Sequence, residues 1–221
     1  MDIVIHPEKL IVSDTPFPPR KGQVLVLCAP SGTGKSTLVK SLRSEFQEVG
    51  FSISCTTREP RQGEAHGREY YFLSVEEFKT KRDAGEFAEW AEVHGNYYGT
   101  PKKPVEKMLF KGMDILFDID FQGAMQLMET MPDAIFVFLM PPSYAELKAR
   151  LEGRNTDSAE VIGRRLRNAM SEMASAPQFQ FWIVNDDLDK AYSELRSIYL
   201  AGKNRPCTNP GLLESILSTW E

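Results

Sequence analysis

The sequence predicts an α/β fold built around a parallel sheet, and three observations lead to this expectation. Short apolar runs typical of buried parallel strands recur at residues 23–28, 113–120, 134–139 and 179–184. Segments with the apolar spacing of helices separate these runs. A glycine-rich phosphate-binding loop pattern lies between the first run and the first helical segment, which is the context that this motif requires.

The composition is that of an ordinary globular protein. Its 221 residues are 42% hydrophobic and 26% charged, enough for one α/β core with inserted lobes. The formal net charge of -5 argues against a general nucleic-acid binder, because such proteins concentrate positive charge. The longest apolar run, residues 134–140, is too short to span a bilayer, and three cysteines without metal-ligand spacing fit a reducing compartment. We therefore expect a cytoplasmic protein that binds neither nucleic acid nor membrane.

The phosphate-binding loop (P-loop) is the strongest motif in the chain. Its glycines permit backbone conformations that let successive N–H groups converge on phosphate oxygens at the positive end of the helix. Lys35 adds a mobile positive charge, and the Ser36 hydroxyl is an oxygen ligand for Mg²⁺. The loop consists of Ala29, Pro30, Ser31, Gly32, Thr33, Gly34, Lys35, Ser36 and Thr37. Ala29 stands where the strict pattern has glycine, so the first turn must form with negative φ. A turn that only joins strand to helix is the alternative.

Residues 51–100 are interpreted as an insertion of short strands and one helix between core elements. Pro60 prevents a helix here, so Arg58 and Arg61 are presented on a loop, where two guanidinium groups can converge on one phosphate. A solvated basic loop is the alternative. Strands are predicted at residues 50–55, 70–73 and within 86–100, with a capping box at Ser74 starting the helix.

Two acidic residues follow the second core strand. Asp118 and Asp120 stand at the carboxyl end of this run, which is where open α/β sheets bind ligands. If the strand continues, the two side chains point to one face, because side chains alternate along a strand. Asp120 alone can also be explained as the N-cap of the next helix.

Arginines gather on two helical segments around a polar break. Arg150 and Arg154 are four residues apart on the first segment, and Arg165 lies on a second segment that Asp157 can cap. This arrangement, over about residues 150–168, is typical of a mobile lid that covers phosphates. A solvated basic helix face is the competing interpretation.

The two ends of the chain are interpreted as appendages. Four prolines in residues 1–20 exclude regular helix or central strand, so this segment is an N-terminal extension. The tail, residues 205–221, predicts a short amphipathic helix that docks on its own domain or on a partner subunit. A homo-oligomer is therefore left open.

Four distinctive stretches occur at residues 54–64, 95–100, 118–123 and 184–188. They closely resemble the successive signatures of guanylate kinases, in the family's order, over about residues 22–204. The resemblance implies a P-loop nucleoside monophosphate kinase with a three-layer parallel-sheet core, an inserted monophosphate-binding lobe and a lid. The implied division is core at 21–50 and 101–204, GMP-binding lobe at 51–100 and lid at 150–168. The implied reaction transfers a phosphoryl group from Mg·ATP to GMP or dGMP.

The resemblance also implies roles for individual residues. Adenine would lie near Asn185, Lys35 would hold the donor phosphates, and Asp118 would bind the metal through water or orient the acceptor. Which of Asp118 and Asp120 serves metal and which serves guanine is left open. Arg150, Arg154 and Arg165 would close over the transferring group. The acceptor phosphate would be clamped by Arg58, Arg61, Tyr70 and Tyr98, and guanine would be recognised by Ser54, Glu89 and Thr100.

Two other functions fit parts of this sequence. A non-catalytic guanylate-kinase-like scaffold module would share the fold, but such modules tend to lose loop and lid residues that this chain retains, including Lys35 and Ser36. A P-loop kinase for another acceptor is the closer rival. The carboxylate of Glu89 favours guanine, because it suits the adjacent N1–H and N2–H donors of that base.

Overall fold

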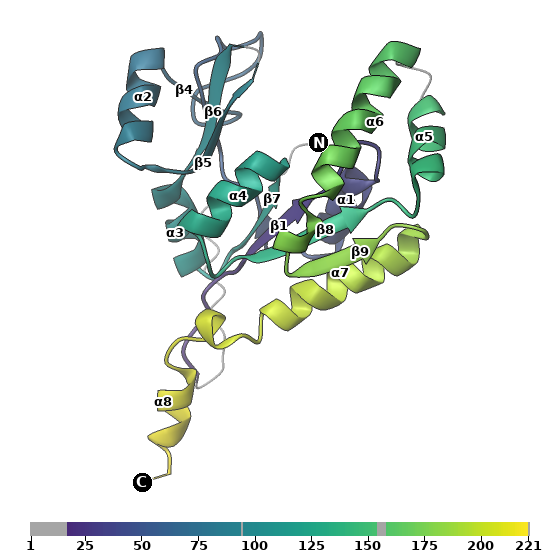
Figure 1. The fold of residues 1–221 in the computed structure, drawn as a ribbon. Helices are drawn as coiled ribbons and strands as arrows, with labels where there is room; N and C mark the ends of the chain where they lie inside the picture. The colour runs from purple at the N-terminus through teal and green to yellow at the C-terminus, as the bar shows by residue number, and fades with distance from the viewer. Residues whose placement is uncertain (1–16, 94, 154–157, 221) are drawn as a thin grey trace.

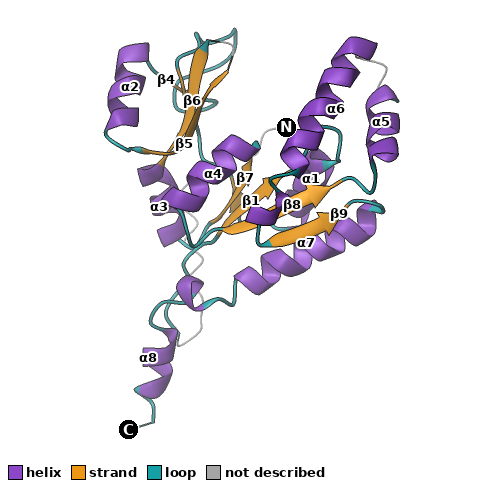
Figure 2. Ribbon diagram, in the orientation of Figure 1, coloured by secondary structure: helices purple, strands orange, loops and turns teal. Residues whose placement is uncertain are grey.

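The computed structural model describes residues 17–93, 95–153 and 158–220. Its core is a five-stranded sheet in the order β2-β7-β1-β8-β9, and every neighbouring pair is parallel (Figures 1 and 2). The strands are β1 (Val24–Cys28), β2 (Val49–Gly50), β7 (Asp114–Asp118), β8 (Ile135–Met140) and β9 (Phe181–Val184). The expected parallel sheet is confirmed, with β1, which leads into the P-loop, at its centre.

Helices cover both faces of this sheet and make three layers. Alternate residues of β1 divide between two buried clusters, because side chains alternate across a strand. Leu25 and Leu27 pack with α1 (Lys35–Glu45) and α7 (Leu188–Gly202) on one face. On the other face, the core includes residues of α3 (Lys102–Phe110) and α4 (Phe121–Thr130). The three-layer α/β prediction is therefore confirmed.

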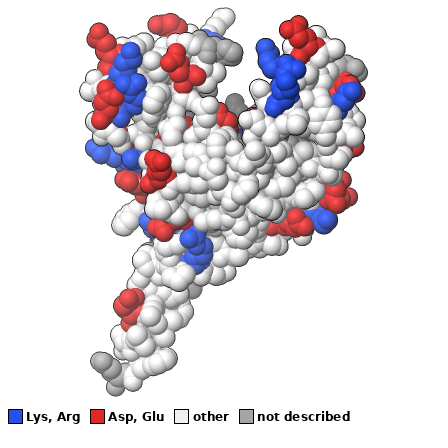
Figure 3. Space-filling view, viewed as in Figure 1, with Lys and Arg blue, Asp and Glu red and all other residues white. Residues whose placement is uncertain are grey.

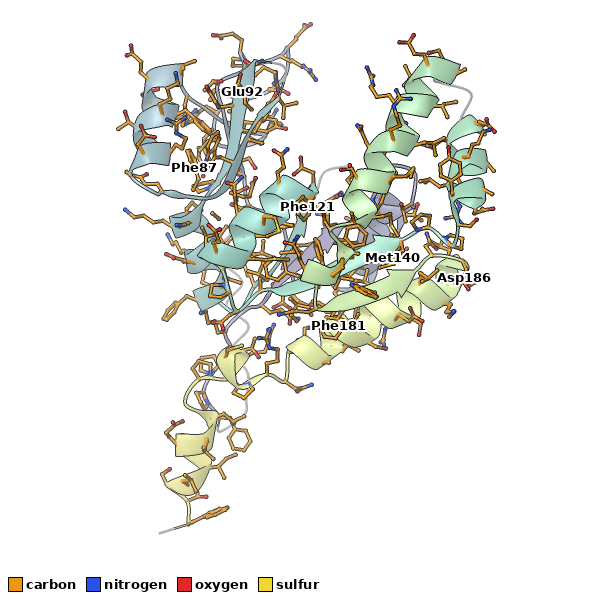
Figure 4. All side chains as sticks on the ribbon, viewed as in Figure 1. Phe87, Glu92, Phe121, Met140, Phe181 and Asp186 are labelled. Atoms are coloured by element: carbon orange, nitrogen blue, oxygen red, sulfur yellow. The ribbon has the colours of Figure 1, made fainter. Side chains whose placement is uncertain are left out.

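A second sheet, in the order β4-β3-β6-β5, projects beside the core. Its elements are β3 (Cys55–Thr56), β4 (Tyr71–Phe72), α2 (Val75–Asp83), β5 (Phe87–Val93) and β6 (Asn96–Pro101). Phe78 of α2 stacks on Phe87 of β5 with ring centroids 4.5 Å apart, and Figure 4 shows Phe87 among the side chains that fill the space below α2. The capping box at Ser74 is present, with both of its hydrogen bonds formed.

One strand prediction was wrong in this region. Residues 50–55 do not form a single strand, because Val49–Gly50 pairs with β7 in the core sheet and Cys55–Thr56 pairs with β4 and β6 in the second sheet. Residues 51–54 between them carry the chain from one sheet to the other. Local apolar spacing cannot reveal such a crossing, since each half has strand character.

The helices α5 (Tyr144–Glu152) and α6 (Ala159–Met173) form an arm with a small apolar core of its own. The N-cap of α6 is Ser158, whose hydroxyl accepts from the N–H of Val161. Asp157, the expected cap, and Arg154 lie outside the described residues. Figure 3 shows a hollow between this arm and the second sheet, and basic side chains of the α6 arm border it.

The two ends of β7 carry acids with different surroundings. Asp114 is 1% exposed and accepts hydrogen bonds from Arg20 (2.8 Å), the Gln23 N–H (2.9 Å) and Tyr199 (2.6 Å). This network ties the chain before β1 to α7. Asp118, at the other end, faces the P-loop.

The last residues run away from the core. The 3-10 turns η1 (Ala176–Gln178) and η2 (Pro206–Thr208) precede β9 and the tail, respectively, and α8 (Leu212–Leu217) projects from the body (Figure 1). Its Leu213 is 64% exposed. In the part of the chain that the structure describes, we find no helix with the length and apolar character needed to cross a membrane.

Candidate active site

The P-loop adopts the backbone that its glycines predict. Gly32 and Gly34 have φ of 93° and 102°, in the left-handed region that side-chain-bearing residues rarely adopt. Gly34 is the N-cap of α1 and offers no side chain to the helix end. The first N–H groups of α1 are consequently left for an anionic ligand, at the positive end of the helix dipole.

Buried contacts fix the shape of this loop. The Thr33 side chain is buried, and its hydroxyl donates to the Pro30 carbonyl at 2.7 Å. The side-chain amide of Asn185 donates to the Thr33 carbonyl at 2.7 Å. An ideal Cβ at Gly32 would lie 2.8 Å from Leu151, so the loop also packs closely against α5. Asn185, expected near adenine, therefore supports the loop itself; an adenine contact stays a prediction.

Lys35 joins the P-loop to the end of β7. Its Nζ lies 2.6 Å from Asp118 Oδ1 and donates to the carbonyl of Ile119 at 3.0 Å. The strand ends at Asp118, so the condition under which Asp118 and Asp120 would share a face is not met. Asp120 instead caps α4, accepting from the Gly123 N–H at 2.9 Å. Asp118 thus pairs with Lys35, whereas Asp120 caps a helix.

The residues around Lys35 suit magnesium in the presence of a nucleotide. Ser36 is exposed in the first turn of α1, and the Asp118 side chain is 33% exposed. Mg²⁺ takes oxygen ligands and is usually bound by one or two carboxylates together with substrate phosphates. Within the described residues, no group of three His, Cys, Asp or Glu side chains could hold a metal by itself. The oxygen donors present therefore fit an ion that the phosphates largely coordinate.

The loop before β4 brings together residues expected to hold the acceptor phosphate. Arg58 Nη2 lies 2.9 Å from both carboxylate oxygens of Glu64, and this carboxylate also accepts from the Arg61 N–H at 2.8 Å. The guanidinium of Arg58 lies over the Tyr70 ring, 5.6 Å from its centroid. Tyr70 meets Tyr98 edge to face, with centroids 6.1 Å apart. Arg58, Tyr70 and Tyr98 therefore form one cluster, with the Arg61 backbone beside it.

Glu64 is a member of this cluster that the sequence did not single out. Hydrogen bonds from the Arg61 N–H and from Arg58 hold the pKa of its carboxyl below the ordinary value. Its position after Gly63 in a turn gave a weak signal. Only the fold shows that its partner is Arg58.

The three residues expected to read guanine lie in one chain of hydrogen bonds. Glu89 of β5 and Thr100 of β6 are paired across the antiparallel ladder, and Thr100 donates to Glu89 Oε1 at 2.6 Å. Ser54 Oγ lies 3.3 Å from the Thr100 hydroxyl. Burial raises the pKa of Glu89, and the negative charge of Asp120 adds to this effect. The result is a half-buried carboxylate at the end of a hydrogen-bonded series of two hydroxyls.

The arm formed by α5 and α6 contributes basic and acidic groups. Arg150 is bound to Glu146 (2.9 Å) and to the Asn185 carbonyl (3.0 Å), so it connects α5 to the residue that supports the P-loop. Arg165 lies on α6. Glu172, also on α6, was not predicted: its pKa is raised by burial and by the charge of Asp120, which indicates that α6 reaches the centre of the site. A single acid on an amphipathic helix gives no sequence signal.

This chain is similar to known proteins over most of its length. The family model described as guanylate kinase matches residues 21–201. A guanylate kinase of Oleidesulfovibrio alaskensis is 54% identical over 202 residues, which cover 91% of this chain and 98% of the relative. The guanylate kinase of Lawsonia intracellularis is 53% identical over 199 residues, covering 90% and 94%, respectively.

Solved structures agree with these relatives. The crystal structure of guanylate kinase from Anaplasma phagocytophilum superposes with a TM-score of 0.66 at 33% identity, covering 93% of this chain and 98% of that chain. The residues matched by the family model, 21–201, include both sheets and the helices α5 and α6. The chain therefore belongs to the guanylate kinase family, and it is an enzyme that transfers the terminal phosphoryl group of ATP to GMP.

Proposed function

We propose that this enzyme binds GMP in the second sheet, holds Mg·ATP at the P-loop, and accepts dGMP as well as GMP. The observation that carries the proposal is the hydrogen-bonded series Ser54, Thr100 and Glu89, in which two hydroxyls lead to a carboxylate at the end. In this assignment residues 51–100 are the GMP-binding lobe, residues 21–50 and 101–204 are the core, and residues 150–168 form the lid.

Guanine suits the Glu89 carboxylate through its paired donors. N1–H and N2–H would both donate to the carboxylate, whose oxygens keep spare lone pairs beside the bond from Thr100. The O6 acceptor suits a hydroxyl donor such as Ser54. Adenine presents an acceptor at N1, and leaving a buried acceptor pair unmatched costs about 1–3 kcal/mol. The sugar 2′-hydroxyl has no part in this recognition, so dGMP is accepted.

The acceptor phosphate is assigned to the cluster of Arg58, Arg61, Tyr70 and Tyr98. A guanidinium fork suits phosphate oxygens, and the Arg58 fork is already oriented by Glu64 and the Tyr70 ring. The tyrosine hydroxyls add neutral donors. Arg58, Tyr70 and Tyr98 thus already lie together in the lobe, where the phosphate would join them.

The donor phosphates are assigned to the N–H groups of the P-loop and to Lys35. Ser36 and Asp118 would hold Mg²⁺, the latter through water, and the ion would neutralise charge on the phosphates. Lys35 stabilises the negative charge of the transferring group, and its contact with Asp118 fixes its reach. Asp120, as cap of α4, belongs to the guanine side, where its charge acts on Glu89.

The lid completes the site. Arg150, Arg154 and Arg165 would surround the transferring group and exclude water, which would otherwise receive the phosphoryl group and waste ATP. Phosphoryl transfer needs little covalent help and depends on positioning of the two nucleotides. The lid therefore acts by holding donor and acceptor in line.

An acceptor panel in one coupled assay tests this proposal. ADP release is measured with GMP, dGMP, AMP, CMP and UMP at equal concentrations, with and without MgCl₂. We expect turnover with the two guanine nucleotides and only in the presence of magnesium. Equal rates across the panel would remove the base-reading argument. A cytoplasmic location and a homo-oligomer stay predictions.

A further inference from the structure

The free edge of β5 is held by two side chains of α4. Gln126 accepts from the Trp90 N–H at 2.9 Å and donates to the Trp90 carbonyl at 2.8 Å. Thr130, one turn further along α4, donates to the Ala88 carbonyl at 2.6 Å. The amide of Gln126 thus replaces the two backbone bonds that a neighbouring antiparallel strand would make.

These hydrogen bonds lie on both sides of Glu89 in the sequence. The carbonyl of Ala88, just before Glu89, and the N–H of Trp90, just after it, are both bonded to side chains of α4. An ideal Cβ at Gly123 would lie 3.5 Å from Glu89 Oε2, which places the first turn of α4 against the carboxylate. The helix therefore supplies both the tether of the β5 backbone and a wall for the Glu89 side chain.

The same helix is connected directly to the donor side. Asp120 caps α4, and Asp118, two residues earlier, contacts Lys35 at 2.6 Å. A continuous path then runs from Lys35 through Asp118 and α4 to β5. Edge strands are often left to solvent or blunted by charges, so sheet formation alone does not require an amide at this position.

We propose that Gln126 is a positioning residue for guanine selectivity, holding the β5 backbone so that the Glu89 carboxylate meets both N1–H and N2–H of the base. The inference rests on the assignment of Glu89 as the guanine-reading group. Gln126 does not touch the nucleotide. Thr130 assists it from the neighbouring turn.

The test compares GMP with inosine monophosphate, which lacks the exocyclic amino group. Gln126→Met keeps the length of the side chain but removes both bonds. We expect kcat/KM for GMP to fall about 5- to 10-fold and kcat/KM for inosine monophosphate to fall less than about 2-fold, because only the former uses the full carboxylate geometry. The KM for ATP stays unchanged. Thr130→Val should shift the ratio in the same direction by a smaller factor, and Thr130→Ser should restore it.

Two controls separate the possible failures. Glu129→Gln alters an exposed residue of the same helix and should leave the GMP-to-inosine ratio at the wild-type value. Glu89→Gln tests the underlying assignment: if it leaves the ratio unchanged, both the base-reading role and this inference are wrong. If Glu89→Gln lowers the ratio but Gln126→Met lowers only the thermal unfolding temperature, Gln126 is merely structural and the inference alone is overturned.

Discussion

The proposed donor and acceptor sides of this active site are built on different principles. The proposed donor side is the P-loop, nine consecutive residues whose shape is fixed by the Thr33 hydroxyl, by Asn185 and by α5. The proposed acceptor side is assembled from side chains of loop residues and of the strands β5 and β6, among them Arg58, Tyr70 and Glu89. A phosphate chain common to all nucleotides suits main-chain recognition, whereas one particular base demands side chains of chosen chemistry.

This difference also explains where the two sides are tied together. The donor loop is braced from outside by a buried amide, while the acceptor lobe is braced by α4, which starts at the capping residue Asp120. Lys35 bridges the two through Asp118. Variants on each side should therefore change the kinetic constants of one nucleotide and spare those of the other.

The largest effect is expected at Lys35, which serves both sides. Lys35→Ala removes the charge that we propose stabilises the transferring phosphoryl group, and losing one such preorganised donor costs about 100- to 1,000-fold in kcat. Folding should be preserved, because the side chain is part of no buried cluster. Steady-state rates and circular dichroism measure the two properties. Lys40→Ala, on an exposed position of the same helix, is the control; a Lys35→Ala enzyme of wild-type rate would place the donor phosphates elsewhere.

Glu89→Gln should be the most damaging change confined to the acceptor side. The amide can still accept from Thr100 but presents an N–H₂ group to guanine donors, so kcat/KM for GMP should fall about 10- to 100-fold. The KM for ATP should remain within twofold. Removal of a half-buried charge should leave the unfolding temperature at pH 7 unchanged or higher. A parallel loss of ATP affinity would show that the two sides are not separable.

The pH dependence follows from the same carboxyl group. Burial, then the charge of Asp120, raises the pKa of Glu89 above its ordinary value of 4.5. As pH falls through this raised pKa the carboxylate is protonated, so kcat/KM for GMP should drop about tenfold per pH unit below it. The stability of the folded protein changes with pH in the opposite direction to kcat/KM. A raised carboxyl pKa contributes stability at low pH, and this contribution is lost as pH rises through the folded-state pKa. Glu89→Gln should abolish both dependences, and profiles identical to wild type would contradict the assignment.

The P-loop could be predicted from the residues alone, whereas the acceptor residues could be assigned only through the family resemblance. The P-loop could be found without any resemblance, because its function depends on local spacing of Gly32, Gly34 and Lys35 and on a strand before and a helix after. The acceptor residues are separated by up to 46 positions, and their roles came from the family resemblance. No local pattern shows that Ser54 will meet Thr100.

The residues that sequence reasoning missed are polar groups whose partners are distant. Gln126 and Glu172 look like ordinary polar positions on amphipathic helices until β5 and Asp120 are placed beside them. The division of residues 50–55 between two sheets was missed for the same reason. Contacts between distant segments decide such cases, and local propensity carries no information about these contacts.

Asn185→Ala should produce an intermediate effect confined to the donor side. The change leaves the Thr33 carbonyl without its buried partner and costs about 1–3 kcal/mol of stability. The loosened loop should raise the KM for ATP about 5- to 10-fold, because the converging N–H groups are no longer held in place. The KM for GMP should not change. Asp189→Ala, at the start of α7 outside the site, serves as a control; an effect on GMP alone would reverse the proposed division.

The smallest effect is expected at Glu64, where two consequences oppose each other. Its carboxylate orients Arg58, but its negative charge also lies close to where the acceptor phosphate is proposed to bind. Glu64→Gln keeps an acceptor for Arg58 and removes the charge, so the KM for GMP should stay within about 2-fold of wild type, because the weaker pairing with Arg58 and the lost repulsion of the phosphate oppose each other. Glu64→Ala removes the orienting acceptor too, and the KM should rise about 3-fold. Measuring both variants with GMP at two salt concentrations separates the effects, since screening weakens only the charge term. If alanine and glutamine behave alike, Arg58 is oriented without Glu64, and the acceptor cluster depends on its aromatic rings instead.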